Sequence, residues 1–339
     1  MKQRDYLFDN YKAFLIILVV IGHFIELTSD DNHFLIAMKW IIFSFHMPAF
    51  VFISGYFSRK KQDIYRMIQQ LLIPYLVFEV LYYVLYTVIL EKDTSLALLY
   101  PKFSLWYLLA MFMWKLVTPL VKKVPGYLWI AFGLGLLVGA SSLDDNYLTL
   151  PRMFTFYPFF LMGTDLDRGS IDRLRARFSR GQALIMFAFI NSLLVWVALK
   201  SDLSVKIFYG RYDYEYLDLT NTEGVALRII CYLISVIMIY VVAILIPGAK
   251  NDFSPLGQKT MSIYLFHGFI FAVFRRGEVW YQSLGNIIEN VILLGASVIT
   301  IWLLCQKPFV VFVDRITHFP MPWLERICRA LALKKKEVS

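Results

Sequence analysis

The chain has 339 residues, of which 59% are hydrophobic and only 17% are charged. Soluble domains carry about a quarter charged residues, so this composition excludes a soluble globular protein. The net charge of +9 does not indicate a nucleic-acid partner, because the basic residues cluster in short segments between long apolar stretches, as the positive-inside bias predicts. The sequence therefore predicts an all-α, polytopic protein of a cell membrane, and we expect a bacterial plasma membrane.

Apolar stretches of roughly 17–25 residues recur along the chain, and each is long enough to cross a hydrocarbon core of about 30 Å. In chain order we expect about ten spans, at residues 10–28, 34–57, 68–91, 103–121, 127–143, 152–166, 182–199, 224–246, 259–274 and 287–307. The fifth and sixth of these are short and close together. We predict one transmembrane bundle over residues 1–318, followed by a cytoplasmic amphipathic and basic tail over residues 319–339.

The loops between the spans differ in charge, and this difference predicts the orientation of the bundle. With the N-terminus in the cytoplasm, the loops on that side are basic: residues 58–66, 121–126, 167–180 and 247–259. The loops on the outer side are neutral or acidic: residues 28–33, 91–95, 141–147 and the tyrosine-rich 209–224. Both termini are then cytoplasmic, which agrees with an even number of spans. Arg275 and Arg276 run against the bias.

The first span carries ionisable side chains at an unusual depth. His23 follows about 13 residues of this span, which puts it roughly 20 Å from the inner surface. One arc of the helix holds four ionisable residues: Asp9, Lys12, His23 and Glu26. Such a stripe cannot face lipid, so it must line the bundle interior or a wet cavity.

Other ionisable residues lie at middle depth in other spans: His46 in the second, Glu79 in the third and His267 in the ninth. Each histidine alone is explained by an interhelical hydrogen bond, but three of them with two carboxylates favour a shared site. No short-spaced histidine pair indicates a metal, so general acid–base chemistry suits them better. Glu26, one turn beyond His23, either accepts the imidazole N–H and fixes its tautomer or extends to the outer interface.

Six segments, in order along most of the chain, resemble the acyltransferase-3 membrane proteins: YLFDNYKAFLIILVVIGHF, FHMPAFVFISGYFSRK, LLIPYLVFE, LWYLLAMF, FYPFFLMGTDL and LGQKTMSIYLFHGF. The branch that they resemble most is the one related to fucose 4-O-acetylase. This resemblance implies an integral-membrane O-acyltransferase that moves an acetyl group, usually from acetyl-CoA, to a sugar hydroxyl of a cell-surface polysaccharide or lipid-linked sugar. His23 matches the histidine of the family's first helix, which implies that it is catalytic.

Two positions depart from the family pattern. Lys12 stands where the family commonly has arginine, so the charge is kept but the bidentate fork is lost. Gln70 stands where members often have arginine before the third span, and Arg66 with the neighbouring basic cluster is expected to supply the missing charge.

Transfer of an acyl group from a thioester needs a general base, an oxyanion stabiliser and a grip on the anionic donor. We predict His23 as the base, oriented by Glu26. The candidates for contacting substrate or stabilising negative charge are Lys12, His46, His267, Glu79 and Trp106. The candidates for the phosphates of acetyl-CoA, the expected co-substrate, are Arg59, Lys60, Lys61 and Arg66, although topology alone also explains such a cluster. Tyr209, Tyr212, Tyr214 and Tyr216 are candidates for stacking on the sugar or for an interfacial belt.

The expected partners are a sugar or glycan acceptor, the lipid bilayer and glycan-synthesis machinery, with no nucleic acid and no metal. The main alternative is a transporter or export component for a polysaccharide or lipid-linked sugar, because intramembrane histidines and carboxylates also build proton relays. Against it, the chain has no two similar halves with matched Gly- or Pro-broken spans. A third hypothesis is an assembly subunit of a glycan-synthesis complex with a degenerate site.

Overall fold

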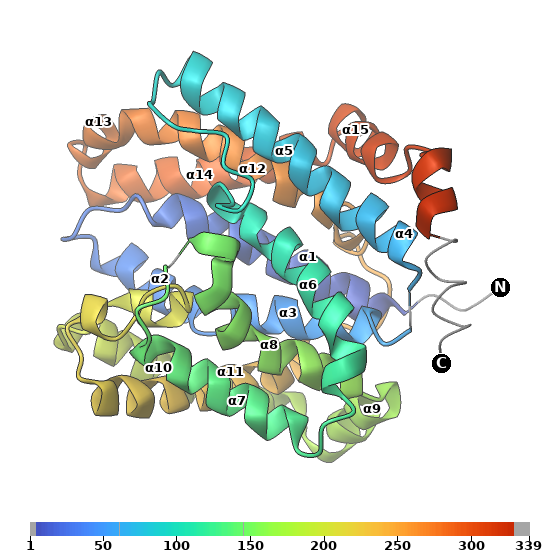
Figure 1. Cartoon of the computed structure of the whole chain (residues 1–339). Helices are drawn as coiled ribbons and strands as arrows, with labels where there is room; N and C mark the ends of the chain where they lie inside the picture. Colours follow the sequence, from blue (N-terminus) through green and yellow to red (C-terminus); the bar gives the residue numbers. More distant parts are fainter. Residues whose placement is uncertain (1–4, 61, 145, 329–339) are drawn as a thin grey trace.

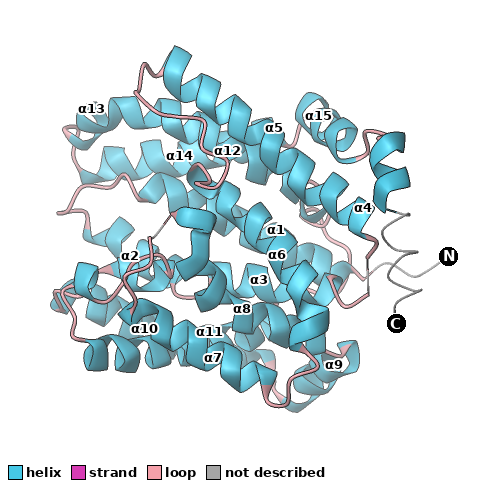
Figure 2. Cartoon of the chain, viewed as in Figure 1, coloured by secondary structure: helices cyan, strands magenta, loops and turns pink. Residues whose placement is uncertain are grey.

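A computed structural model describes residues 5–60, 62–144 and 146–328. Within these residues every regular element is a helix, no strand occurs, and loops join the helices (Figure 2). The all-α prediction is therefore confirmed. Most of the long helices run side by side, and they form three groups (Figure 1).

The central group contains the helix with His23. It consists of α1 (Tyr6–Ile25), α2 (His33–Phe43), α3 (His46–Phe57) and α6 (Trp106–Val121), which follows the short 3-10 segment η3 (Phe103–Leu105). α1 packs against α2 and α3 within this group and against α12 and α14 outside it. Because α1 has neighbours on several sides, polar groups on it can face other helices and not lipid.

The two outer groups enclose this centre. The first group, at the top of Figure 1, consists of α4 (Ile64–Met67), α5 (Ile73–Val84), α12 (Thr260–Phe274), α13 (Glu278–Gln282), α14 (Asn286–Leu304) and α15 (Lys307–Thr317). The second, at the bottom, consists of α7 (Tyr127–Leu137), α8 (Leu150–Asp165), α9 (Arg168–Arg177), α10 (Arg180–Lys200) and α11 (Asn221–Leu245). The close contact between α3 and α8 joins the second group to the centre.

Seven helical stretches in the described residues are long and apolar enough to cross a membrane: Tyr6–Ile25, His33–Phe57, Ile64–Ile89, Phe103–Val121, Arg180–Lys200, Asn221–Leu245 and Asn286–Leu304. The protein is therefore a multi-pass membrane protein. The other three predicted spans hold shorter helices: Tyr127–Ala140, α8 and α12. The 15 residues of α12 extend only about 22 Å, which is less than a hydrocarbon core of about 30 Å.

The loops gather at two ends of the bundle, in the two sets that their charges predict. We call the first the basic end; it holds α4, α9 and α15, at the right of Figure 1. There Asn10 donates from Nδ2 to the carbonyl oxygen of Pro247, at 2.7 Å, and Lys122 pairs with Asp165, at 2.7 Å. These contacts join loops far apart in the sequence that are predicted to lie on one side.

We call the opposite end the tyrosine-rich end, after the loop over residues 201–220. There the backbone N–H of Ser29 donates to Oε1 of Glu289, at 2.7 Å, and Gln282 donates from Nε2 to the carbonyl oxygen of Leu27, at 2.7 Å. The alternation of loops between the two ends therefore follows the predicted order of spans.

Pro48 explains the break between α2 and α3 in the middle of the second span. Proline has no N–H, so the carbonyl four residues earlier, on Ser44, loses its helical partner. The hydroxyl of Ser235 on α11 donates to that carbonyl, at 2.7 Å. A freed backbone group inside a membrane needs such a partner, and the break at Phe45 brings His46 to the beginning of α3.

Two glycines allow α3 and α8 to approach closely. A Cβ on Gly55 would collide with the backbone of Phe160, and a Cβ on Gly163 would collide with the backbone of Phe52. Small residues at helix crossings are the usual means of close packing in membranes. This crossing fixes α8 beside the helices of the site.

The predicted tail over residues 319–339 lies partly outside the described residues. Residues 322–328 form a short helix after α15 at the basic end. Residues 329–339 lie outside the described part of the chain, so the division at residue 318 stays a prediction.

Candidate active site

His23 lines a small cavity between α1, α3, α6 and α12. The lining residues are Val19, His23, Met47, Phe50, Ser104, Trp106, Tyr107 and Tyr264. Its volume of about 20 Å³ admits one or two water-sized groups. Four of these residues carry a hydrogen-bonding hydroxyl or imidazole, so the mainly apolar wall of the cavity offers a few polar groups.

Glu26 orients His23. Nδ1 of His23 lies 3.3 Å from Oε2 of Glu26, because α1 ends at Ile25 and the two side chains are three residues apart. An ionised carboxylate can only accept, so Nδ1 carries the hydrogen and Nε2 carries a lone pair. The two side chains are 23% and 24% exposed. This geometry leaves Nε2 of His23 available as a base.

Tyr209 from the tyrosine-rich end covers the same carboxylate. Burial, the negative charge of Glu26 and a hydrogen bond to Glu26 together raise the pKa of Tyr209 well above its ordinary value. Tyr209 therefore stays a neutral phenol that donates to Glu26. Its ring stacks on Phe43, with 4.7 Å between the centroids, and Lys39 lies near enough to attract the carboxylate. Glu26 is thus held from three sides.

His267 and His46 are fixed through their Nδ1 atoms. Nδ1 of His267 lies 2.7 Å from the carbonyl oxygen of Tyr264, and Nδ1 of His46 lies 2.7 Å from that of Ile42. Carbonyls only accept, so each neutral imidazole carries its hydrogen on Nδ1 and a lone pair on Nε2. In this form neither histidine donates to an oxyanion through Nε2.

His267 is the histidine that lies against His23. The two ring centroids are 5.2 Å apart, and Nε2 of His267 is buried with no hydrogen-bond partner among the described residues. His46 is 3% exposed and packs edge-on against Phe43, with 4.9 Å between the centroids. His267 therefore belongs to the wall behind His23, while His46 lies one aromatic layer away.

Glu79 acts on the cavity through the backbone. It is fully buried, and its Oε1 accepts the backbone N–H of Lys102, at 2.6 Å, while Nζ of the same lysine lies 3.8 Å from Oε2. The next residue, Phe103, has a left-handed φ of 49°, which is strained for an aromatic side chain. Its ring lies 4.7 Å from that of His23, between centroids. Glu79 thus holds a strained turn against the catalytic candidate.

Ser104 follows that turn and supplies a hydroxyl to the cavity. Its backbone carbonyl accepts from the hydroxyl of Tyr264. The Ser104 hydroxyl is buried beside the phenols of Tyr82 and Tyr264, which are close enough to interact with it, but no well-directed hydrogen bond joins it to a described residue. Its proton is therefore available to a group in the cavity.

Trp106 and Tyr107 complete the wall. Trp106 stacks on Phe156, with 5.6 Å between the centroids, and the guanidinium of Arg152 lies 5.0 Å from its ring centre. Tyr107 shares a hydrogen bond with Ser54. Trp106 thus lies at the cavity as the sequence suggests, beside a cation that the sequence did not single out.

The remaining candidates lie at the basic end. Lys12 is three turns from His23, about 16 Å along the helix; its Nζ pairs with Asp9, at 3.0 Å, and lies 4.9 Å from the ring centre of Phe57. Arg59 donates to the carbonyl oxygen of Leu166, at 2.7 Å. Lys60 and Arg66 are exposed, and Lys61 lies outside the described residues. The side chains of Lys12, Arg59, Lys60 and Arg66 do not line the cavity.

Sequence reasoning missed Ser104, Phe103, Tyr107 and Tyr264, because ordinary serines and aromatics are not anomalous in an apolar span. The one available signal was their position beside Trp106 and His267. The sugar-stacking hypothesis also needs a correction, because Tyr214 is fully buried and its hydroxyl donates to the carbonyl oxygen of Leu136, at 2.6 Å. Tyr212 and Tyr216 stack on each other, with 4.3 Å between the centroids.

No group of three or more His, Cys, Asp or Glu side chains in the described residues is arranged to hold a metal ion. The arrangement at His23 is instead that of a base with an orienting carboxylate, beside an unused hydroxyl donor. This set can deprotonate an alcohol and stabilise a developing oxyanion.

A family model described as an acyltransferase domain, that of acyltransferase family 3, matches residues 5–306. The chain is 26% identical to the nodulation protein NolL of Sinorhizobium fredii (strain NBRC 101917 / NGR234), in an alignment that covers 91% of this chain and 90% of the relative. No solved structure matches.

Proposed function

Because the chain belongs to acyltransferase family 3 and is a membrane O-acyltransferase, we propose that it transfers an acetyl group from acetyl-CoA to a sugar hydroxyl. The acceptor is a cell-surface polysaccharide or a lipid-linked sugar, and the enzyme works in a bacterial plasma membrane. Family membership favours this enzyme over the transporter and over the assembly subunit that the sequence left open. The single observation that carries the chemistry is the imidazole of His23 at a buried cavity, with Nδ1 engaged by Glu26.

In the proposed reaction His23 is the general base. Nε2 takes the proton of the acceptor hydroxyl while the oxygen attacks the thioester carbonyl. The tetrahedral intermediate then collapses, the carbon–sulfur bond breaks, and Nε2–H returns the proton to the CoA thiolate. Glu26 accepts the Nδ1 hydrogen bond throughout and stabilises the imidazolium that forms in between.

Ser104 is the proposed donor to the oxyanion. The Ser104 hydroxyl is unused and lines the same cavity as His23, while the neutral forms of His46 and His267 present lone pairs. A preorganised donor in a water-poor site stabilises a developing charge without reorganisation. The strained turn at Phe103, clipped by Glu79, supports this role because it fixes the serine before the substrate arrives.

The donor enters from the basic end, which we assign to the cytoplasm. Lys60 and Arg66 are exposed there, and Arg59 lies on the same loop. These cations suit the phosphates of CoA. The long, thin pantetheine arm then reaches towards His23 from one end, and the sugar reaches it from the other.

The test uses purified protein in nanodiscs with radiolabelled acetyl-CoA and a panel of p-nitrophenyl glycosides. We expect acceptor-dependent release of CoA and label on the sugar. Release of CoA without labelled sugar, or no transfer to any glycan from the host surface, would contradict the proposal. A mass spectrum of the surface glycan with and without the protein identifies the acyl group and the acceptor.

A further inference from the structure

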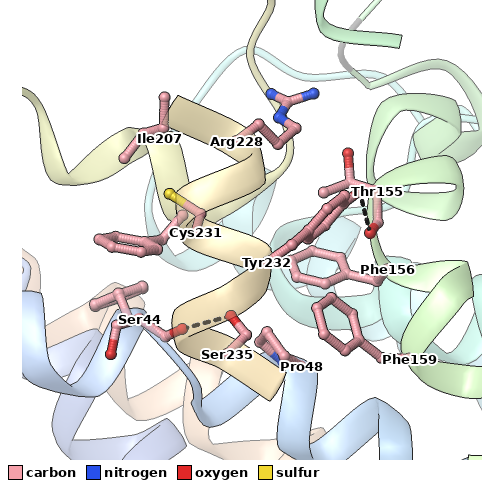
Figure 3. Close-up of a pocket in the computed structure, with 12 residues that line it drawn as sticks. Ser44, Pro48, Thr155, Phe156, Phe159, Ile207, Arg228, Cys231, Tyr232 and Ser235 are labelled. Atoms are coloured by element: carbon pink, nitrogen blue, oxygen red, sulfur yellow. Dashed lines mark hydrogen bonds between the residues drawn. The ribbon is translucent and has the colours of Figure 1, made fainter. Parts of the chain in front are cut away.

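A second cavity lies beside the first, towards the tyrosine-rich end. Its lining residues are Phe43, Ser44, Pro48, Thr155, Phe156, Phe159, Ile207, Phe208, Arg228, Cys231, Tyr232 and Ser235. Figure 3 shows Arg228 and Thr155 together at one end of this cavity, and the bonded pair Ser44 and Ser235 at the other. Its volume is about 20 Å³, room for one or two water-sized groups.

Arg228 brings a buried positive charge to this cavity. It is 2% exposed, and no carboxylate among the described residues forms an ion pair with it. Its guanidinium lies over the ring of Tyr214, 4.6 Å from the ring centre, and its terminal nitrogens make two long hydrogen bonds within the described residues, both of 3.3 Å, to the carbonyl oxygens of Gly135 and Tyr212. Nε has no partner in the described part of the chain. A charge inside a membrane bundle is costly unless it is paired, and it marks a functional site by default.

Thr155 adds a second unused donor. Its hydroxyl is buried and has no hydrogen-bond partner among the described residues. The other polar groups here are occupied, since Tyr232 donates to the carbonyl oxygen of Thr155, at 2.9 Å, and Ser235 donates to Ser44. The cavity therefore offers two free donors, Nε–H of Arg228 and Oγ–H of Thr155. Two donors with a positive charge match an oxyanion.

The two cavities share aromatic walls. Phe156 lines the Arg228 cavity and stacks on Trp106, which lines the His23 cavity. Phe43 lines the Arg228 cavity and stacks on Tyr209, which covers Glu26. A ligand that reaches His23 from the tyrosine-rich end therefore passes next to Arg228. The second cavity is too small for a sugar ring, but its room for one or two water-sized groups suits the oxygens of a single acidic group.

We propose that the Arg228 cavity binds the carboxylate or phosphate group of an acidic acceptor. This inference rests on the proposed function, which brings the acceptor from the tyrosine-rich end, and it narrows the substrate class to sugars with a negative charge. Arg228 and Thr155 hold the oxyanion, and the sugar hydroxyl extends from it to His23.

The test measures binding without any acyl donor, so that its failure is separate from a failure of acyl transfer. Thermal unfolding of the protein in nanodiscs is followed at matched ionic strength with glucuronic acid, glucose 6-phosphate or glucose. We expect glucuronic acid, glucose 6-phosphate or both to raise the melting temperature while glucose does not. A response to the first assigns a carboxylate, and a response to the second assigns a phosphate. Equal responses to all three sugars, or none to any, would overturn the inference.

Variants separate a binding role from a structural one. Arg228→Gln should weaken binding of the responding sugar about tenfold or more, because a charge-assisted hydrogen bond is lost, and Arg228→Lys should retain part of it. Thr155→Val, which keeps the shape of the side chain, should weaken binding less and still fold. Arg211→Gln is the control, since Arg211 lies over Tyr212, 5.1 Å from the ring centre, and does not line the cavity. Unchanged affinity in both Arg228→Lys and Thr155→Val would contradict the proposal.

Discussion

The two ends of the bundle use charge in different ways. At the basic end the charged side chains are partly exposed and paired with one another, as Arg168 is with Asp5, at 2.6 Å, and with Asp172, at 2.5 Å. Towards the tyrosine-rich end some charges are exposed, as in the pair of Arg275 and Glu278, but others are buried, and Glu289 and Arg228 are 0% and 2% exposed. Exposed pairs contribute little to stability, so the basic end mainly sets topology. Buried charges are costly, so each needs a structural or chemical role.

The buried charges themselves fall into two kinds. Glu289 on α14 accepts from Ser29 and Asn32, the latter at 2.5 Å, and so fastens the loop between α1 and α2 to α14. Glu79 clips the backbone of Lys102 in the same way. Arg228 has no such carboxylate or full set of partners among the described residues. Glu289 and Glu79 therefore have structural roles, whereas Arg228 still has a donor that a ligand can use.

Among the variants considered, we expect the largest loss of activity when His23 is replaced. His23→Ala should lower kcat about 10²- to 10⁴-fold, because general base catalysis contributes that much. His318→Ala is the control, since His318 is exposed at the basic end and should leave kcat unchanged. Steady-state transfer of labelled acetyl groups measures both. If His23→Ala kept full activity, the assignment of the base would be wrong.

Ser104→Ala should lower kcat about 10²- to 10³-fold with little change in KM, because one oxyanion donor is removed. Ser104→Thr keeps the hydroxyl and should recover part of the activity. Ser297→Ala serves as control, since this buried serine donates only to Leu293 in its own helix, at 2.8 Å. A loss of activity matched by an equal loss of thermal stability would show that Ser104 only supports the fold.

Glu26→Gln should lower kcat about tenfold to a hundredfold, by the loss of one charge-assisted hydrogen bond to His23. Tyr209→Phe should act in the same direction with a smaller effect, because it removes one donor to the carboxylate. Glu278→Gln is the control at the same end, where Glu278 pairs with Arg275, at 3.7 Å. A rise in KM with unchanged kcat would assign Glu26 to substrate binding.

Replacing a charged residue at the basic end should change the kinetics less than replacing a residue at the His23 cavity. Arg66→Gln should raise the KM for acetyl-CoA about twofold to fivefold without changing kcat, because an exposed charge pair contributes modestly. Arg177→Gln, an exposed arginine of α9 that lies over Phe178, is the control. Initial rates over a range of acetyl-CoA concentrations measure this KM. An unchanged KM in the Arg66 variant would show that Arg66 does not contact the donor.

We expect the smallest effect, on thermal stability, from Asp144, which lies in an exposed turn. Backbone N–H groups of Asn146 and Tyr147 lower the pKa of Asp144. A folded pKa below the unfolded one contributes stability above the unfolded pKa, and this contribution is lost as the pH falls through the folded pKa. Asp144→Asn should therefore lower the melting temperature slightly at pH 7 and not at all near pH 2. An equal effect at both pH values would exclude this linkage.

The sequence alone determined the class of fold and the main catalytic candidate. Hydropathy and loop charge predict ten helical segments, and the structure has a helix at each of them. The prediction succeeds because a chain in lipid must satisfy its backbone within helices. His23 stood out since an ionisable group is costly in an apolar span. The family resemblance was confirmed by the match over residues 5–306.

Only the tertiary structure decided which groups meet. His267 lies against His23 while Lys12 lies three turns away, although the sequence predicts all three as members of one site. Ser104 and Thr155 carry unused donors that no hydropathy pattern reveals, because an unsatisfied hydroxyl depends on what packs around it. Composition and periodicity fix what a single helix must bury, but the partners of a buried group are set by the packing of several helices.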